Sequence, residues 1–324
     1  MPNRLIRNTA ILLKTETTSG TDAVPTGTTD ALLVSNVSVT PINANLVSRD
    51  LIRPYLGGSE QLVGTRYAQI SFDLEIAGSG TVATAPAWAS ALRACGMAQT
   101  LTATVRADYT PVSANFESAT IYHFDDGIRH TFTGCRGEVT IKFNQGERPM
   151  LSLSFTGLYT TPTAASLPAV TLTAWRTPQV VCEANTGDLT FGGTHSPSTA
   201  PAITGGTAIP SQGIEISLGN SVNFNPLLGG EDVQISQREV TGKITLDLSA
   251  AQEVTYMGQV EAATLTTIGL IHGTVSNTRA MLWLPSVQLI NPAKDEVNGK
   301  RLISFDLRAV PISGNDEVRL VTSF

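Results

Sequence analysis

Apolar and polar residues alternate in several short stretches of the chain. The most regular stretch is 68–76, where apolar residues occupy every second position. Similar alternation occurs in 137–144, 150–156 and 242–248. Because successive side chains of a strand point to opposite faces, each stretch predicts a strand with one buried and one exposed face. The pattern therefore predicts a mainly β protein.

Two stretches depart from this alternation and predict short helices. In 84–96, Thr84 is a candidate N-cap, Pro86 falls in the first turn and Gly96 is a stop signal. In 249–262, Ser249 and Gln252 match the capping box that opens a helix.

One long stretch of the chain occurs twice. Pro54-Tyr-Leu-Gly-Gly58 returns as Pro226-Leu-Leu-Gly-Gly230, and Ile70-Ser-Phe-Asp-Leu74 returns as Ile244-Thr-Leu-Asp-Leu248. The offset is 172 residues at the proline and 174 at the aspartate, so the second copy has a two-residue insertion between these segments. Matches in the same order over a turn, a loop and a strand indicate duplication of a folding unit.

The duplication predicts two tandem, related β-sandwich or barrel domains, each flanked by one short helix. The first domain is expected over 1–165, with an N-terminal arm, and the second over 166–324, because 160–168 has the composition of a linker. Strands are also expected within 171–193, docked on the second domain. The first double glycine is expected in the middle of an extended excursion over 43–66.

Composition narrows the class of protein further. Charged residues are 15% of the chain and hydrophobic residues 41%, as in a globular protein. A net charge of −6 argues against a surface that grips nucleic acid through its phosphates. The apolar run Ala10-Ile-Leu-Leu13 is too short for a signal peptide, and nothing later approaches transmembrane length. The three cysteines have no metal-type spacing and indicate free thiols in a reducing cytoplasm.

Catalytic and metal-binding motifs are not found in the sequence. Gly242-Lys243 is followed by Ile244, so it does not complete a phosphate-binding loop. His123 and His130 would face each other across a hairpin that turns at Asp126-Gly127. Two imidazoles without a third ligand make a poor zinc site, and a polar cross-strand pair explains them better. We therefore expect no enzyme activity, no metal and no cofactor.

Several segments resemble the tail tube (major tail) proteins of long-tailed bacteriophages. The resemblance lies in the order and spacing of segments that together span nearly the whole chain: 10–22, 32–38, 56–58, 188–193 and 216–220. It implies β-sandwich or barrel units, about six of which make a ring, and rings that stack into a tube carrying DNA during ejection. It also implies synthesis in the host cytoplasm, a place in the virion, and tape measure, tail terminator and distal tail proteins as partners.

The resemblance and the duplication together predict how the chain assembles. Three copies would supply six units, which favours a trimeric ring with pseudo-sixfold symmetry over a hexamer whose second domains decorate the outside. The polar faces of the two repeated strands are candidates for lining the lumen, past which DNA would move without specific binding: Gln69, Ser71, Asp73, Glu75, Lys243, Thr245 and Asp247. The double-glycine segments are candidates for contacts between rings or subunits: Pro54, Leu56, Gly57, Gly58, Pro226, Leu228, Gly229 and Gly230.

One rival interpretation comes from a different class of protein. Tandem β-sandwiches also form binding modules, such as tail-tip or receptor- and carbohydrate-binding proteins. Such modules display exposed aromatic platforms, whereas aromatic residues are only 6% of this chain and its three tryptophans have apolar or strand neighbours. A decoration or capsid-associated protein is a third possibility, and a hydrolase is the last.

Overall fold

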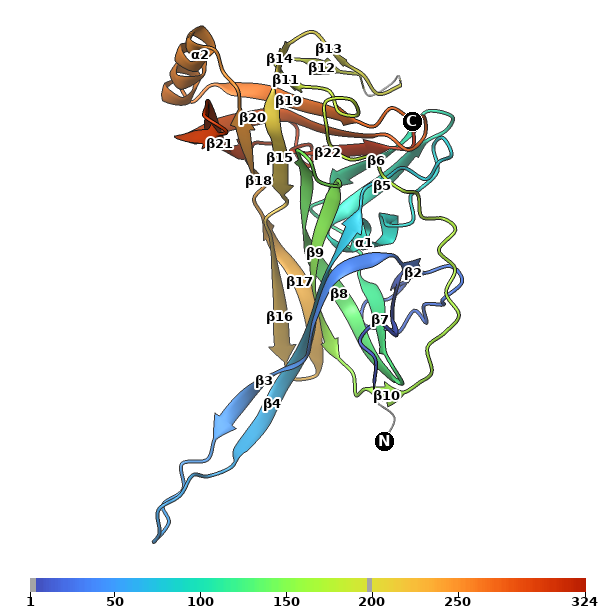
Figure 1. Cartoon of the computed structure of the whole chain (residues 1–324). Helices are drawn as coiled ribbons and strands as arrows, with labels where there is room; N and C mark the ends of the chain where they lie inside the picture. Colours follow the sequence, from blue (N-terminus) through green and yellow to red (C-terminus); the bar gives the residue numbers. More distant parts are fainter. Residues whose placement is uncertain (1–3, 197–199) are drawn as a thin grey trace.

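The computed structural model describes residues 4–196 and 200–324, so the first three residues of the expected N-terminal arm lie outside it. The described chain consists mainly of antiparallel strands and has two helices, which confirms the prediction of a mainly β fold (Figure 1). The elements of the first half are β1 (Thr9–Thr15), β2 (Ala31–Leu32), β3 (Val34–Ser48), β4 (Gln61–Glu75), α1 (Ala89–Ala94), β5 (Met97–Thr102), β6 (Arg106–Pro111), β7 (Ala119–Asp125), β8 (Ile128–Asn144), β9 (Met150–Tyr159) and β10 (Thr163–Ala164). Those of the second half are β11 (Leu189–Phe191), β12 (Thr194–His195), β13 (Ile203–Thr204), β14 (Thr207–Ile209), β15 (Ser211–Ser217), β16 (Asn220–Leu227), β17 (Gly230–Arg238), β18 (Thr241–Leu246), α2 (Ala250–Glu261), β19 (Leu265–His272), β20 (Ala280–Val297), β21 (Lys300–Ala309) and β22 (Arg319–Thr322).

The order in which strands pair is repeated in the two halves. In the first half the neighbours run β1-β7-β8-β9-β4-β3. In the second they run β11-β19-β20-β21-β18-β15. The registers also agree, because Ile70 lies opposite Phe155 and its repeat Ile244 lies opposite Phe305. The sequence repeat is therefore a repeat of strand pairing as well.

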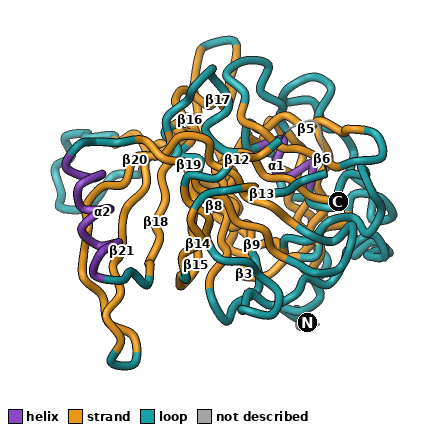
Figure 2. The backbone as a smooth tube through the Cα atoms, turned by 90° about the horizontal axis from the view of Figure 1, so that it is seen from above, coloured by secondary structure: helices purple, strands orange, loops and turns teal. Residues whose placement is uncertain are grey.

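The two halves are joined by strand pairing at two places. The C-terminal end of β8 pairs with β15, and β22 pairs with β6. One hydrophobic core accordingly includes buried side chains from both halves, among them Phe72, Phe143, Phe155 and Phe305. The helices lie at separate positions, α2 beside β20 and β21, and α1 inside the first half (Figure 2).

The connection between the halves differs from the expectation. Residues 171–188 contain turns and one isolated bridge, from Thr186 to His272, so the strands predicted there are wrong except for β11. The apolar residues of this stretch dock as loop: Val181 is buried, and the Trp175 indole donates to the Ala31 carbonyl at 3.0 Å. The proposed boundary at 165/166 falls where this connection begins and stays a prediction.

The N-terminal capping signals in the sequence predict the start of one helix correctly and of the other incorrectly. α2 begins as predicted, with Ser249 and Gln252 forming a complete capping box. α1 begins only at Ala89, so the predicted cap at Thr84 is wrong. Trp88 explains the difference, because its indole is buried and donates to the Ala77 carbonyl at 2.9 Å, which fixes the chain before the helix starts.

Candidate functional site

The first double glycine lies at the tip of a long hairpin. β3 and β4 stay paired from Val34–Leu74 out to Ser48–Gln61, so only 49–60 of the expected excursion is loop (Figure 1). Ile52 and Leu56 are each 103% exposed at this tip, and Tyr55 is also exposed. Pro54, Gly57 and Gly58 lie in the same loop, and a side chain added at either glycine would meet no other atom. The tip therefore presents large apolar side chains that contact little of their own chain.

The second double glycine lies at the tip of another hairpin. β16 and β17 pair from Asn220–Arg238 to Leu227–Gly230, so Pro226 lies one residue before the end of β16 and Leu228-Gly229 form the turn. Gly229 has φ +90°, a conformation that favours glycine. Leu228 is 107% exposed. Both hairpins run toward the bottom of Figure 1, where the first tip extends well beyond the rest of the chain and the second ends beside the first half.

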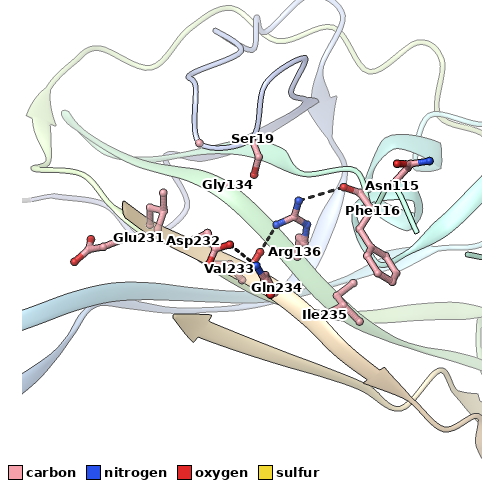
Figure 3. Close-up of a pocket in the computed structure, with 12 residues that line it drawn as sticks. Ser19, Asn115, Phe116, Gly134, Arg136, Glu231, Asp232, Val233, Gln234 and Ile235 are labelled. Carbon is pink, nitrogen blue, oxygen red and sulfur yellow. Dashed lines mark hydrogen bonds between the residues drawn. The ribbon is translucent and has the colours of Figure 1, made fainter. Parts of the chain in front are cut away.

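Contacts with the first half hold this second hairpin in place. Tyr67 on β4 stacks on Phe224 of β16, with ring centroids 5.2 Å apart. The Arg136 guanidinium on β8 donates to the carbonyls of Val233 and Phe116, the latter at 3.2 Å (Figure 3). A cavity of about 450 Å³ lies beside these contacts. Burial lowers the pKa of Arg136, and its two terminal nitrogens donate to backbone carbonyls. The cavity therefore lies along a structural contact between the two halves.

The seven polar residues expected to line a lumen lie on the exposed face of the sheet. Gln69, Ser71, Asp73 and Glu75 are half-buried on β4, between fully buried neighbours. Lys243 and Thr245 lie on β18, and Asp247 follows it and forms an ion pair with Lys300. The structure thus places six of the seven on the polar sides of two equivalent strands and Asp247 directly after the second.

This polar face continues across the junction between the halves. Lys142 on β8 lies opposite Glu215 on β15, and Glu215 lies opposite Lys243 on β18. Lys243 in turn lies opposite Asp306 on β21. Directly opposed side chains of a sheet are neighbours on one face, so charges of alternating sign cross the junction in a single row. The sequence could not reveal this row because its members come from four separate strands.

Two strand edges are exposed, and the sequence alone does not identify which strands provide them. In the described chain β3 pairs only with β4, and residues 293–297 of β20 pair only with β21. Each segment thus has backbone groups along one free edge, where another strand can add. A signal for β3 was present in the sequence, because its fifteen residues include no charged side chain to protect the edge.

The described histidines and acidic residues are the side chains that a metal site would require. Among the described residues no group of three or more His, Cys, Asp or Glu could hold a metal ion. His123 and His130 face each other as predicted, with ring centroids 6.0 Å apart. Burial lowers the pKa of both imidazoles, so the pair is neutral at pH 7. In the same described residues no helix has the length and apolarity needed to cross a bilayer.

The described chain is thus a mainly antiparallel β protein whose exposed features include two hairpin tips and two strand edges. The chain belongs to the phage tail tube protein family, because that family's model matches residues 6–318. The protein is therefore a structural component of a phage virion, which confirms the family resemblance seen in the sequence. Comparison with curated proteins gives no match.

Proposed function

We propose that this protein assembles into stacked rings that form the tail tube, and that each ring contains three chains with pseudo-sixfold symmetry. The observation that carries the proposal is the repeated pairing order, which gives every chain two equivalent units. Three chains then supply the six units of a ring, and each chain already contains one of the unit-to-unit junctions.

The continuous polar face favours this arrangement over a ring of six chains with decorating second domains. The row from Lys142 through Glu215 to Lys243 puts the exposed faces of both units on one surface. A second domain on the outside of the tube would not be expected to share one continuous polar surface with the domain that lines the lumen. Both units are accordingly assigned to the tube wall.

The same face is proposed to line the lumen, with the six polar residues of β4 and β18, together with Asp247, toward the DNA. Charges of both signs alternate there, and the whole chain carries −6. Such a lining offers DNA phosphates no net attraction, so the nucleic acid can pass without being held. No catalytic step or cofactor is part of this role.

The two hairpin tips are proposed to contact the next ring. Ile52, Leu56 and Leu228 are fully exposed in the single chain and would become buried on stacking. Fully burying such a side chain is worth about 1.5–3 kcal/mol. Tape measure, tail terminator and distal tail proteins, the partners that the resemblance implies, are proposed to contact the assembled tube as well.

The rival role as a carbohydrate-binding module has less support. Trp88 and Trp283 are buried, and Trp175 is half-buried with its indole engaged by the Ala31 carbonyl. None of the three tryptophans offers the open platform that sugar binding uses.

Electron microscopy across a protein concentration series, with mass measurement in parallel, tests the proposal. Rings or striated tubes built from three chains are the expected result. Rings of six whole chains would keep the tube function and contradict the pseudo-sixfold arrangement. Monomers at every concentration, together with saturable glycan binding, would overturn the tube function.

A further inference from the structure

The junction inside the chain is an antiparallel pairing with a defined register. The register pairs β15 with β8 as follows: Ile214 with Phe143, Glu215 with Lys142, Ile216 with Ile141, and Ser217 with Thr140. The four apolar side chains of this set are at most 1% exposed. This seam shows how the β8-type edge of one unit accepts the β15-type edge of the next.

The repeat identifies the corresponding edges at the two outer ends of the chain. On one side, β15 pairs with β18 as β3 pairs with β4. Glu215 lies opposite Lys243, and Thr40 lies opposite Gln69, the residue that the repeat equates with Lys243. Ser217 lies opposite Thr241, and Asn43 lies opposite the equivalent Tyr67. Thr40 and Asn43 are thus the counterparts of Glu215 and Ser217.

The same comparison identifies the counterpart of β8. Lys142 lies opposite Met150 on β9, and Val297 lies opposite the equivalent Lys300 on β21. Thr140 lies opposite Ser152, and Asp295 lies opposite the equivalent Leu302. Val297 and Asp295 are thus the counterparts of Lys142 and Thr140.

The segments that contain these counterparts are more exposed than the segments that form the internal junction. Residues 140–144 and 213–217 alternate between buried and half-buried, whereas 38–42 and 293–297 are almost all exposed. The chain therefore has one free edge of each type, and two edges of opposite type on one molecule fit two different neighbours. A contact of this heterologous kind closes into a ring when the rotation permits.

We propose that β3 of one chain pairs antiparallel with residues 293–297 of β20 in a second copy of the chain. The register places Thr40 opposite Val297 and Asn43 opposite Asp295, with Pro41 and Ile42 sharing the intervening position as a bulge. The inference rests on the proposed ring and names the strands that close it. Each ring would then contain three junctions within chains and three between chains.

The junction between chains differs from the internal one in its side chains. Ala293 and Glu296 stand at the positions of Glu138 and Ile141, so the carboxylate and one buried apolar side chain of the internal seam are missing. Pro41 also removes one backbone donor from β3. Backbone hydrogen bonds supply most of the binding free energy of this contact. Before assembly, the charged side chains of β20 disfavour pairing of the free edge with other strands.

Cysteine pairs at the inferred register test the pairing. The test variant combines Thr40→Cys with Val297→Cys, in a background with Cys182→Ser because Cys95 and Cys135 are already buried. The matched reference is Glu215→Cys with Lys142→Cys, the same position in the internal junction. The mismatched control is Thr40→Cys with Ala293→Cys, which moves the partner by about 13 Å along the strand. That shift is well beyond the ~7 Å within which two Cα atoms allow a disulfide.

Mild oxidation of assembled protein, followed by non-reducing electrophoresis, gives the readout. We expect a ladder that ends at three linked chains for the test variant, roughly tenfold or more above the mismatched control, because disulfide geometry is strict. A ladder that continues to six would uphold the pairing and contradict the trimer. Rings without cross-links, while the internal reference oxidises, would overturn the pairing and leave the tube function standing. Dimers formed by Thr40→Cys alone would also overturn it, because they require two β3 edges to meet.

Discussion

The carboxylate of Glu138 on β8 accepts a hydrogen bond from the backbone N–H of Asn220, with Oε2 2.6 Å from the nitrogen. Its other oxygen accepts from the Ser217 hydroxyl at 2.7 Å and from the Gly219 N–H at 2.8 Å. These donors lie within 217–220, where β15 ends and the β16–β17 hairpin begins. One side chain of the first half therefore fixes the direction of the second half's hairpin.

Replacing this carboxylate should weaken the junction. Glu138→Gln keeps the shape but leaves one acceptor oxygen for three donors, and hydrogen bonds to charged groups contribute about 1.5–3 kcal/mol each. We expect the free energy of unfolding to fall by roughly 2 kcal/mol in chemical denaturation. Glu261→Gln, an exposed carboxylate on α2, is the matched control. Equal stabilities of the two variants would show that the Glu138 contacts contribute little.

Removing the apolar tip of the first hairpin should separate folding from assembly. Ile52→Ser combined with Leu56→Ser deletes two side chains that contact almost nothing in the single chain. The melting temperature should therefore stay unchanged. The protein concentration at which tubes form, measured by light scattering, should rise by roughly tenfold for each lost contact of about 1.4 kcal/mol.

An exposed apolar residue away from the tips provides the control for that experiment. Val254 on α2 is 75% exposed, and Val254→Ser should leave tube formation unchanged. If the tip variant assembles as readily as the wild type, the tip takes no part in stacking. A lower melting temperature of the tip variant would instead place its side chains in the fold of the single chain.

Gly219 should tolerate no side chain. It has φ +66°, and a Cβ built on it would lie 2.0 Å from the Glu239 carbonyl oxygen. Gly219→Ala should reduce the free energy of unfolding by about 1–3 kcal/mol through backbone strain alone. Gly258→Ala is the opposite control, because this glycine lies inside α2 with no atom near the added Cβ. It should stabilise the protein by about 0.5–1 kcal/mol. Thermal unfolding of both variants measures the two shifts, and shifts in the same direction would contradict the prediction.

Stability should fall as the solution becomes mildly acidic. Burial lowers the pKa of His123 below its ordinary value of 6.5, and the facing His130 lowers it further. The unfolded chain therefore binds more protons below pH 6.5, and stability is lost as the pH falls from about 6.5 through the folded-state pKa. His123→Asn should flatten this slope by at most ~1.4 kcal/mol per pH unit. Melting temperatures at several pH values between 7 and 5 measure it, and an unchanged slope would contradict the assignment.

The features predicted correctly from the sequence are those set by nearby residues. The capping box needs only Ser249 and Gln252, and the facing of His123 and His130 needs only the turn between them. The repeat also predicts a relationship between distant residues, because two copies of one sequence pattern indicate two structurally equivalent strands. Ile70 and Ile244 do occupy equivalent places opposite Phe155 and Phe305.

The features missed depend on which distant edges meet. Nothing local to β8 marks its last residues for pairing with β15, which lies about seventy positions further along the chain. The same holds for β22, which returns from the end of the chain to β6. The sequence predicts an extended excursion over 43–66 but not the pairing of its two arms, because its polar and β-branched residues lack a buried face. Pairing between β3 and β4 satisfies their backbone groups.

The internal junction between β8 and β15 changes how many encounters a ring requires. Six separate units would have to associate through six contacts between molecules, whereas three two-unit chains need only three. Each association between molecules loses translational and rotational freedom worth an estimated 4–15 kcal/mol or more. A ring of six separate units needs five such associations before it closes, and the proposed ring of three chains needs two, so synthesis of the two units as one chain removes three of the five losses. Because fewer associations are needed, the proposed ring can close even if the contact between chains, at the partly charged edge of β20, is weak.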